Sequence, residues 1–384
     1  MDSEEKTAHQ VRRLQASVRD LQNALRLASK MEFTSRPPKL MLSFSSLELN
    51  ETNPYGRILA NNDRGVVHGI ERLQSIGVMV VGLNGLGALT AEAFSRYGVK
   101  KLLLIDNAPV TMADLDYMHY KASDVGRKRE DQVAAHLLAV NPDVDVLTAN
   151  LSLRVPVELV SALRSKLLPP QHSDSSDDDD DDDNDDIDSD DGGNGPNQGR
   201  GVRLSRLTHD DLNVVFLCVA DGDLAILLNE LCCELGLRFV YVFVRPNGIT
   251  GEVVSVIPGR SSCIQCFEKR KLFKTSLVSN DDSAAELGIR LVEASLPTTE
   301  CILSGLSIHN TVMDMLGFGS FCSRLEYDGY LEELERSGFL APVHQCPSTF
   351  CRQQQQKYAK PVPAPAPVVP GTAPSSPVPP KRNA

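Results

Sequence analysis

The sequence predicts a doubly wound α/β fold, a mostly parallel sheet with helices on both faces, over residues 45–352. Three observations support this prediction. Apolar runs of strand length alternate with amphipathic stretches, a glycine-rich loop joins the first run to the next helix, and two cysteine pairs lie late in the chain. Each intervening helix carries the chain back along the sheet, so successive strands run parallel. With 384 residues, 41% of them hydrophobic, the chain can bury such a core.

The expected elements begin with a short apolar run, Val78-Met79-Val80-Val81, which is typical of a strand buried on both faces. Further strands are expected at 102–105, 144–148, 214–219 and 239–244, and helices at 86–97, 130–140 and 224–235. The helices carry apolar residues at helical spacing, whereas the strands are continuous apolar runs. This order predicts at least five strands of one sheet.

The loop after the first strand reads Gly82-Leu83-Asn84-Gly85-Leu86-Gly87 and leads into a helix. Small residues let the backbone approach a phosphate or ribose, and the first N–H groups of the helix attract an anion. Asp106 ends the next strand about 20 residues later, where an acid holds ribose hydroxyls. The loop therefore indicates a nucleotide site. The alternative is a tight strand–helix turn that binds nothing.

Two cysteine pairs, Cys263-x-x-Cys266 and Cys346-x-x-x-x-Cys351, have the spacing of metal ligands. Each pair grips an ion from one loop, and together they predict a closed tetrahedral zinc site with a structural role. The alternative is four reduced thiols without metal. The remaining cysteines lie in apolar surroundings and are expected in the core: Cys218, Cys232, Cys233, Cys301 and Cys322.

Three further segments are expected outside the folded part. Residues 1–35 contain a helix whose apolar residues follow coiled-coil spacing, so it either pairs with a partner or lies alone as an amphipathic helix. The acidic insert at 169–201 and the Pro-rich tail at 360–384 are expected to be disordered. The insert either binds a basic partner or is simply solvated.

Charge and hydropathy exclude some classes of function. The net charge is −12, but residues 174–191 hold 13 aspartates, so the remaining 38 acids nearly balance the 39 Lys and Arg. This balance gives no reason to expect nucleic-acid binding. No apolar run approaches the ~20 residues of a membrane span. The acidic N-terminus lacks a secretory signal, which favours a cytoplasmic protein with access to the nucleus.

Motifs through most of the chain from residue 40 to 358 carry a family resemblance. They are Asn53-Pro54-Tyr55-x-Arg57, the Gly82–Gly87 loop, Leu102–Asp106, Asn141–Val144, Ile257-Pro258-Gly259, both cysteine pairs and Ser295–Thr299. With them the chain resembles the ubiquitin-like modifier-activating enzymes that act on ubiquitin-fold modifier 1. This family has a Rossmann-like adenylation domain of the ThiF type.

The resemblance implies an activity and its partners. Such enzymes use ATP and magnesium to adenylate the modifier's C-terminal glycine, then hold the modifier as a thioester on a cysteine. A conjugating enzyme takes it from there. The resemblance also implies a homodimer or heterodimer with zinc as a structural ion. Nucleotide-binding roles pass to Gly82, Gly85, Gly87, Asp106, Arg57, Arg129, Ser152 and Asp221.

Several positions depart from the family pattern. Asp114-Leu115-Asp116-Tyr117 stands where the family has two amides and an arginine, so two acids would repel a triphosphate. Arg129 replaces a lysine and Ser152 an asparagine, and the magnesium-type aspartate is shifted by one residue to Asp221. A strand would turn Asp221 to the other face, whereas a loop would absorb the shift.

The family's nucleophile is missing. Its cysteine should lie three residues before Ser295, where Val292 stands, and a valine forms no thioester. Cys301 is either a substitute nucleophile or helix core. The family's modifier-binding motif has a tryptophan, and this chain has none. Three hypotheses remain: an active enzyme with a rewired site, a catalytically silent subunit of the same pathway, and adenylation without a thioester.

Overall fold

A single eight-stranded sheet forms the centre of the computed structural model, which describes residues 55–168, 209–272 and 294–358. The strands lie in the order β3-β2-β1-β4-β5-β6-β7-β8. They are β1 Gly77–Val81, β2 Lys101–Ile105, β3 Asp145–Thr148, β4 Val214–Leu217, β5 Arg238–Val244, β6 Thr250–Val256, β7 Arg324–Asp328 and β8 Glu333–Arg336. The helices that pack on it are α3 Gly85–Tyr97, α4 Arg129–Val140, α5 Pro156–Leu167, α6 Gly222–Leu235, α7 Ile264–Lys269, α9 Pro297–Leu316 and α10 Thr349–Tyr358.

The first five strands are parallel and confirm the doubly wound prediction. β1 pairs with β2 on one side and with β4 on the other, and all four pairings among β1–β5 are parallel. Every residue of β1 and β2 is buried, as continuous apolar runs require. The chain leaves β1 toward one edge and returns from β3 to β4 beside it. The β1–β4 boundary is therefore the point where the strand order reverses, and ligands of this fold class bind there.

The last three strands extend the sheet in antiparallel fashion. β6 pairs with β5, β7 with β6, and β8 with β7, all antiparallel. Short turns suffice between antiparallel neighbours, so no crossover helix is needed between β5 and β6. The sequence reasoning did not place these three strands.

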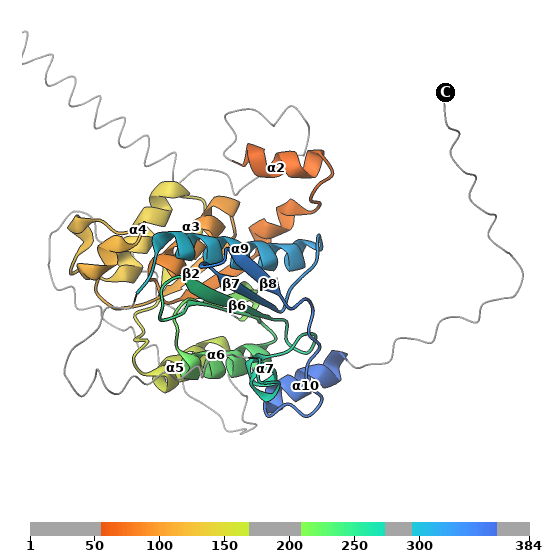
Figure 1. Cartoon of the computed structure of the whole chain (residues 1–384). Coiled ribbons are helices and arrows are strands. Elements are labelled where there is room, and N and C mark those ends of the chain that lie inside the picture. Colours follow the sequence, from red (N-terminus) through yellow and green to blue (C-terminus); the bar gives the residue numbers. More distant parts are fainter. Residues whose placement is uncertain (1–54, 169–208, 273–293, 359–384) are drawn as a thin grey trace, which may run out of the picture.

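Helices cover both faces of the sheet (Figure 1). Helices α3, α4 and α9 lie on one face, and α5, α6, α7 and α10 lie on the other. Each face has its own apolar core. Phe94, Phe216 and Leu303 belong to the α3/α9 side, whereas Phe239, Tyr241 and Leu228 belong to the α6 side. Parallel strands with both faces buried need two such layers.

Two polar side chains start the helices that flank the strand-order reversal. The side chain of Asn84 accepts a hydrogen bond from the backbone N–H of Gly87 at 3.0 Å, which caps α3. Asp221 caps α6 in the same way, accepting from the N–H of Leu224 at 2.9 Å. Each cap satisfies a backbone donor that the helix itself leaves open.

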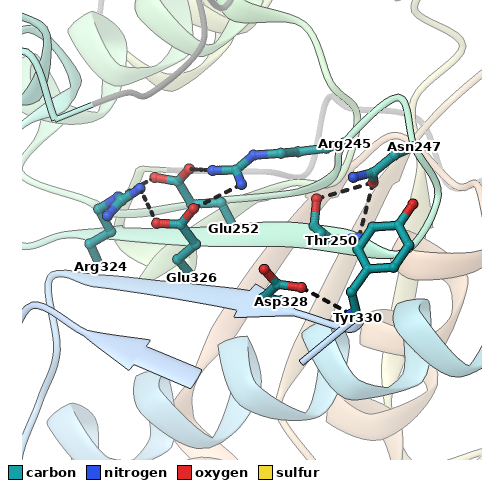
Figure 2. Close-up of polar contacts among 8 residues, drawn as sticks. All are labelled: Arg245, Asn247, Thr250, Glu252, Arg324, Glu326, Asp328 and Tyr330. Carbon is teal, nitrogen blue, oxygen red and sulfur yellow. Dashed lines mark hydrogen bonds and ion pairs between the residues drawn. The ribbon is translucent and has the colours of Figure 1, made fainter. Parts of the chain in front are cut away.

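A closed ring of four charges lies on the antiparallel part of the sheet (Figure 2). The guanidinium of Arg245 pairs with Glu252 at 2.9 Å and Glu326 at 2.8 Å, and Arg324 pairs with the same two carboxylates at 2.5 and 2.8 Å. Gly251 faces α9, because a Cβ there would meet Leu303, so Glu252 points to the opposite face. Glu252, Arg324 and Glu326 are buried, Arg245 is partly exposed, and the ring carries no net charge.

Three predicted segments lie outside the described residues: the N-terminal helix at 1–35, the acidic insert at 169–201 and the tail at 360–384. The described chain also continues beyond the predicted end at residue 352, because α10 runs to Tyr358 and packs on α6. Among the helices that the structure describes, none is long and apolar enough to cross a membrane.

Candidate functional site

The glycine-rich loop lies at the strand-order reversal, between the ends of β1 and β4. Gly82 has φ +87°, a left-handed conformation that glycine adopts without strain. A Cβ at Gly82 would lie 2.5 Å from the side chain of Val219, which follows β4. A Cβ at Gly87 would lie 1.8 Å from the carbonyl oxygen of Gly82. The loop is thus tightly folded at the place where a nucleotide would bind.

Asp106 joins this loop to the end of β2. Its Oδ2 accepts a hydrogen bond from the N–H of Leu83 at 2.9 Å, and its Oδ1 accepts from the N–H of Ala108 at 3.1 Å. The side chain is buried, with 1% of its surface exposed. Asp106 therefore stands where the sequence predicts the ribose-binding acid, and its carboxylate braces the loop.

Arg129, at the start of α4, is held by two aspartates. Its guanidinium lies 3.2 Å from Asp106 Oδ2 and 2.7 Å from Asp114 Oδ1. Burial alone would lower the pKa of Arg129, but the charges of Asp106 and Asp114 outweigh burial and raise it. The guanidinium is therefore charged and already neutralised. From the sequence, Asp114 is expected to repel a triphosphate. In the structure Asp114 also pairs with Arg129, the cation expected to bind the phosphates.

An acid from α9 lies against the first turn of α3. A Cβ at Gly85 would be 1.9 Å from Oε2 of Glu300 and 2.7 Å from the ring of Tyr117, so only glycine fits. Glu300 is 2% exposed, and its Oε1 accepts a hydrogen bond from Ser295 at 2.7 Å. Its Oε2 has no hydrogen-bond partner among the described residues. Burial raises the pKa of this carboxyl group.

Glu300 therefore lies against the first turn of the helix that follows the glycine-rich loop. The N-terminus of a helix following a glycine-rich loop binds anions through its N–H groups and its dipole. Here a carboxyl group is already present. Its second oxygen lacks a hydrogen bond, and its burial disfavours the charged form. A phosphate at this helix end would meet a carboxyl group of the chain itself.

The other predicted nucleotide residues lie near the strand ends or on the surface. Asp221 lies in the loop after β4, and its side chain caps α6. Ser152 follows β3 and accepts from the N–H of Arg154 at 3.3 Å. Arg57 is exposed on the helix α2, Gly56–Asp63. Within the described residues, neither Arg57 nor Ser152 makes a side-chain hydrogen bond to the glycine-rich loop.

The structure locates five of the cysteines that the sequence placed outside the metal site. Val292 lies outside the described residues. The prediction that Cys301 belongs to the core is wrong, because this thiol is exposed on α9, with Sγ 3.2 Å from Sδ of Met118. Successive residues of a helix point in different directions, so Cys301 lies on the exposed face of α9 although its neighbour Glu300 is buried. The other four predicted core cysteines are buried: Cys218, Cys232, Cys233 and Cys322.

The four predicted zinc ligands come together. Sγ of Cys263 lies 3.7 Å from Cys266 and 3.5 Å from Cys346, and Sγ of Cys266 lies 4.0 Å from Cys351. All four are buried, and their sulfurs lie within 4.8 Å of one another. Tetrahedral zinc with Zn–S bonds of about 2.3 Å needs sulfur separations of about 3.8 Å. The cluster can therefore hold zinc, joining α7 to α10.

Hydrogen bonds to sulfur orient this cluster. The N–H of Val343 points at Sγ of Cys266 at 3.3 Å, and the amide of Gln355 points at Sγ of Cys351 at 3.4 Å. Donors of this kind stabilise thiolates and fix their direction. Four thiolates leave no coordination position for water, so the ion would be structural.

Glu300 is the site residue that sequence reasoning missed. Its signal was nevertheless present, because it is an acid among small and apolar residues on the inner face of α9: Thr299, Leu303, Ser304, Ser307 and Ile308. A charged side chain at a core position of an amphipathic helix needs a reason. Tyr120 was missed too, and its hydroxyl donates to the carbonyl of Leu83 in the loop.

Comparisons with known proteins agree with this geometry. The model of the ThiF family matches residues 55–166. The ubiquitin-like modifier-activating enzyme 5 of Dictyostelium discoideum is 27% identical over 313 residues, covering 82% of this chain and 71% of the relative. The Gallus gallus protein of the same name is 27% identical over 353 residues, covering 91% and 77%. The Rattus norvegicus protein is 26% identical, covering 83% and 68%.

Solved structures show the same fold at low identity. Escherichia coli MccB with ATP superposes with a TM-score of 0.55 at 13% identity, covering 78% of this chain and 75% of MccB. PaaA superposes with a TM-score of 0.51 at 15% identity, covering 83% and 81%. Residues 55–166 are therefore a ThiF-family domain, and the chain is a distant homologue of the ubiquitin-like modifier-activating enzyme 5 proteins.

Proposed function

We propose that this chain is a catalytically silent subunit of a ubiquitin-like modifier pathway, which keeps the adenylation fold but forms no thioester itself. Its relatives carry the name of modifier-activating enzymes, which suggests that a modifier and its conjugating enzyme are partners. The nucleotide site is degenerate in this proposal. The chain would work beside an active subunit, as one half of a heterodimer.

The observation that carries the proposal is the carboxyl group of Glu300 against Gly85. The two lie so close that any Cβ at position 85 would be 1.9 Å from Oε2. An ionised carboxylate 4 Å from a phosphate charge costs about 4 kcal/mol at an effective dielectric constant of 20. Every 1.4 kcal/mol is about tenfold in affinity. At such a separation an ionised Glu300 would weaken ATP binding by roughly a thousandfold.

The ion pairs of Arg129 also support a site that binds ATP poorly. A guanidinium that neutralises phosphate must be available to it, but this one already contacts Asp106 and Asp114 at 3.2 and 2.7 Å. A nucleotide would have to replace at least one of these ion pairs. Breaking a buried charge pair leaves an uncompensated carboxylate, which is costly.

Cys301 is a poor replacement for the missing nucleophile. The thiolate is the reactive form, and burial together with the charge of Glu300 raises the pKa of this thiol. The residue also sits within the second turn of α9, where backbone hydrogen bonds fix its position. Thioester formation on this chain is therefore disfavoured, with Val292 at the family's nucleophile position.

Adenylation without a thioester is the second candidate, and the glycine-rich loop favours it. Gly82, Gly85 and Gly87 are all packed where a Cβ would clash, and Asp106 braces the loop from the end of β2. A loop kept in this form suits nucleotide binding once Glu300 is neutral. In that case ATP and magnesium would bind, with Asp221 near the metal, and zinc would remain structural.

Calorimetric titration with ATP and magnesium tests the proposal. The wild-type chain should show no saturable binding at millimolar ATP. Glu300→Gln and Glu300→Met remove the charge, and each should bind ATP at least tenfold more tightly than the wild type. Glu158→Gln on α5, an exposed acid, is the matched control and should behave as the wild type. Tight wild-type binding that neither Glu300 variant changes would overturn the proposal.

A further inference from the structure

Three side chains away from the nucleotide site converge between α3, α4 and the segment before Tyr120. Nε2 of His136 lies 3.2 Å from Oε2 of Glu92, and Nδ1 of His119 lies 4.0 Å from the same oxygen. The two imidazole rings meet edge to face with centroids 4.5 Å apart. The three ligand atoms all lie within 4.8 Å of one another. Two imidazoles and one carboxylate form a metal-ligating set.

The spacing suits a divalent transition metal. Zinc takes imidazole nitrogen and carboxylate oxygen at about 2.0–2.2 Å, so two ligand atoms of a tetrahedral site are about 3.3 Å apart. The Glu92–His136 separation of 3.2 Å already has this value, and the Glu92–His119 separation of 4.0 Å exceeds it by less than about 1 Å. Glu92 and His136 are partly exposed. An ion therefore has a path from solvent, and water has a fourth position.

The state of His119 points independently to a ligand. Its side chain is 3% exposed, and its Nδ1 has no hydrogen-bond partner among the described residues, although it faces Glu92. A buried ring nitrogen without a partner is costly. A metal ion would satisfy this atom.

Glu92 is held in the orientation that a ligand needs. Nε and Nη2 of Arg96 contact Oε1 of Glu92 at 2.9 and 2.6 Å, which leaves Oε2 toward the histidines. A group that hydrogen-bonds to a ligating carboxylate in this way fixes its orientation. Lys121 and Asp124 are the other charged groups near His119, with opposite signs.

We propose that Glu92, His119 and His136 form a second metal site, a three-ligand zinc site with one position open to water. This site is separate from the cysteine cluster and does not depend on the proposed function. An ion there would tie α3 and α4 to the segment of His119. The next residue, Tyr120, donates its hydroxyl to the carbonyl of Leu83, so the same segment supports the glycine-rich loop.

Metal content tests the site directly. The full-length chain, loaded with zinc and dialysed against a weak chelator, should hold two zinc ions, as measured by plasma mass spectrometry. His136→Ala should hold one, because it removes an accessible ligand of the second site. His309→Ala, an exposed histidine on α9 outside the cluster, is the control and should hold two.

Cobalt distinguishes the two sites. Cobalt bound by thiolates has intense near-ultraviolet charge-transfer bands, which oxygen and nitrogen ligands lack. His136→Ala and the shape-conserving Glu92→Gln should both keep the thiolate bands and lose the second cobalt, which also reports an intact fold. One metal per chain in the wild type, or two in both cluster variants, would overturn the proposal.

Discussion

The four-charge ring of Arg245, Glu252, Arg324 and Glu326 gives a sharp prediction, because each of its members contacts two opposite charges. The turn between β5 and β6 follows Arg245, and its Gly248 carbonyl accepts a hydrogen bond from the N–H of Leu296. Leu296 caps α9, four residues before Glu300. Glu252→Gln keeps the side-chain shape and removes one charge from the ring.

The magnitude follows from burial and charge count. Glu252 is 1% exposed and pairs with both arginines, at 2.9 and 2.5 Å. After the substitution, the buried guanidinium of Arg324 and the partly exposed one of Arg245 share one carboxylate, and the ring carries a net positive charge. Removing one partner of a buried ion pair costs about 3–5 kcal/mol. An exposed pair is worth only about 0–1 kcal/mol.

Urea denaturation in zinc-containing buffer measures the loss of unfolding free energy. Glu333→Gln on exposed β8 is the control, with an expected change within about 0.5 kcal/mol. Exchanging both Glu252 and Arg324 for Met should restore part of the loss, because no unpaired charge of that pair remains. A loss below about 1 kcal/mol for Glu252→Gln would contradict this prediction, because a loss that small is typical of a solvated ion pair.

Two other predictions concern metal and pH. Cys351→Ser should lose the cysteine-site zinc and release α10 from α7, seen as a lower melting temperature and faster amide exchange in α10, and a variant that retains this zinc would contradict the assigned ligands. Burial raises the pKa of Glu130 from 4.5 to about 7, so the protonated form favours folding. The stabilisation by protonated Glu130 is complete below about pH 4.5. As the pH rises through 7, the free energy of unfolding falls by up to about 3 kcal/mol. Glu130→Gln should flatten this decline in urea titrations across that range, and an unchanged slope would show that Glu130 is solvated.

The parallel part of the fold was predictable because its signals are local. Continuous apolar runs marked β1, β2 and β4, and the glycine-rich loop with Asn84 marked the start of α3. The cysteine cluster was predictable because each closely spaced pair supplies two of the four ligands that one metal ion needs. In these cases the residues that form a feature are neighbours in sequence, or their chemistry requires a common partner.

The remaining features depend on contacts between distant residues. Glu300 meets Gly85 across 215 positions, and no local pattern indicates which helix end α9 will face. The exposure of Cys301 likewise depends on the rotation of α9 about its axis. Strands β6 and β7 carry buried charged residues that the ion ring pairs, and β8 is exposed throughout, so none of the three shows a continuous apolar run.

The most direct test of the central claim uses the zinc-loaded full chain with ATP, magnesium and the ubiquitin-fold modifier. Two signals are followed: modifier-dependent exchange of pyrophosphate into ATP, which reports adenylation, and a thiol-sensitive band on a gel, which reports a thioester. A catalytically silent chain on its own should give neither signal. Exchange without a band would contradict the silent-subunit reading in favour of adenylation alone. Exchange with a band that Cys301→Ser abolishes would show an active enzyme with a relocated nucleophile.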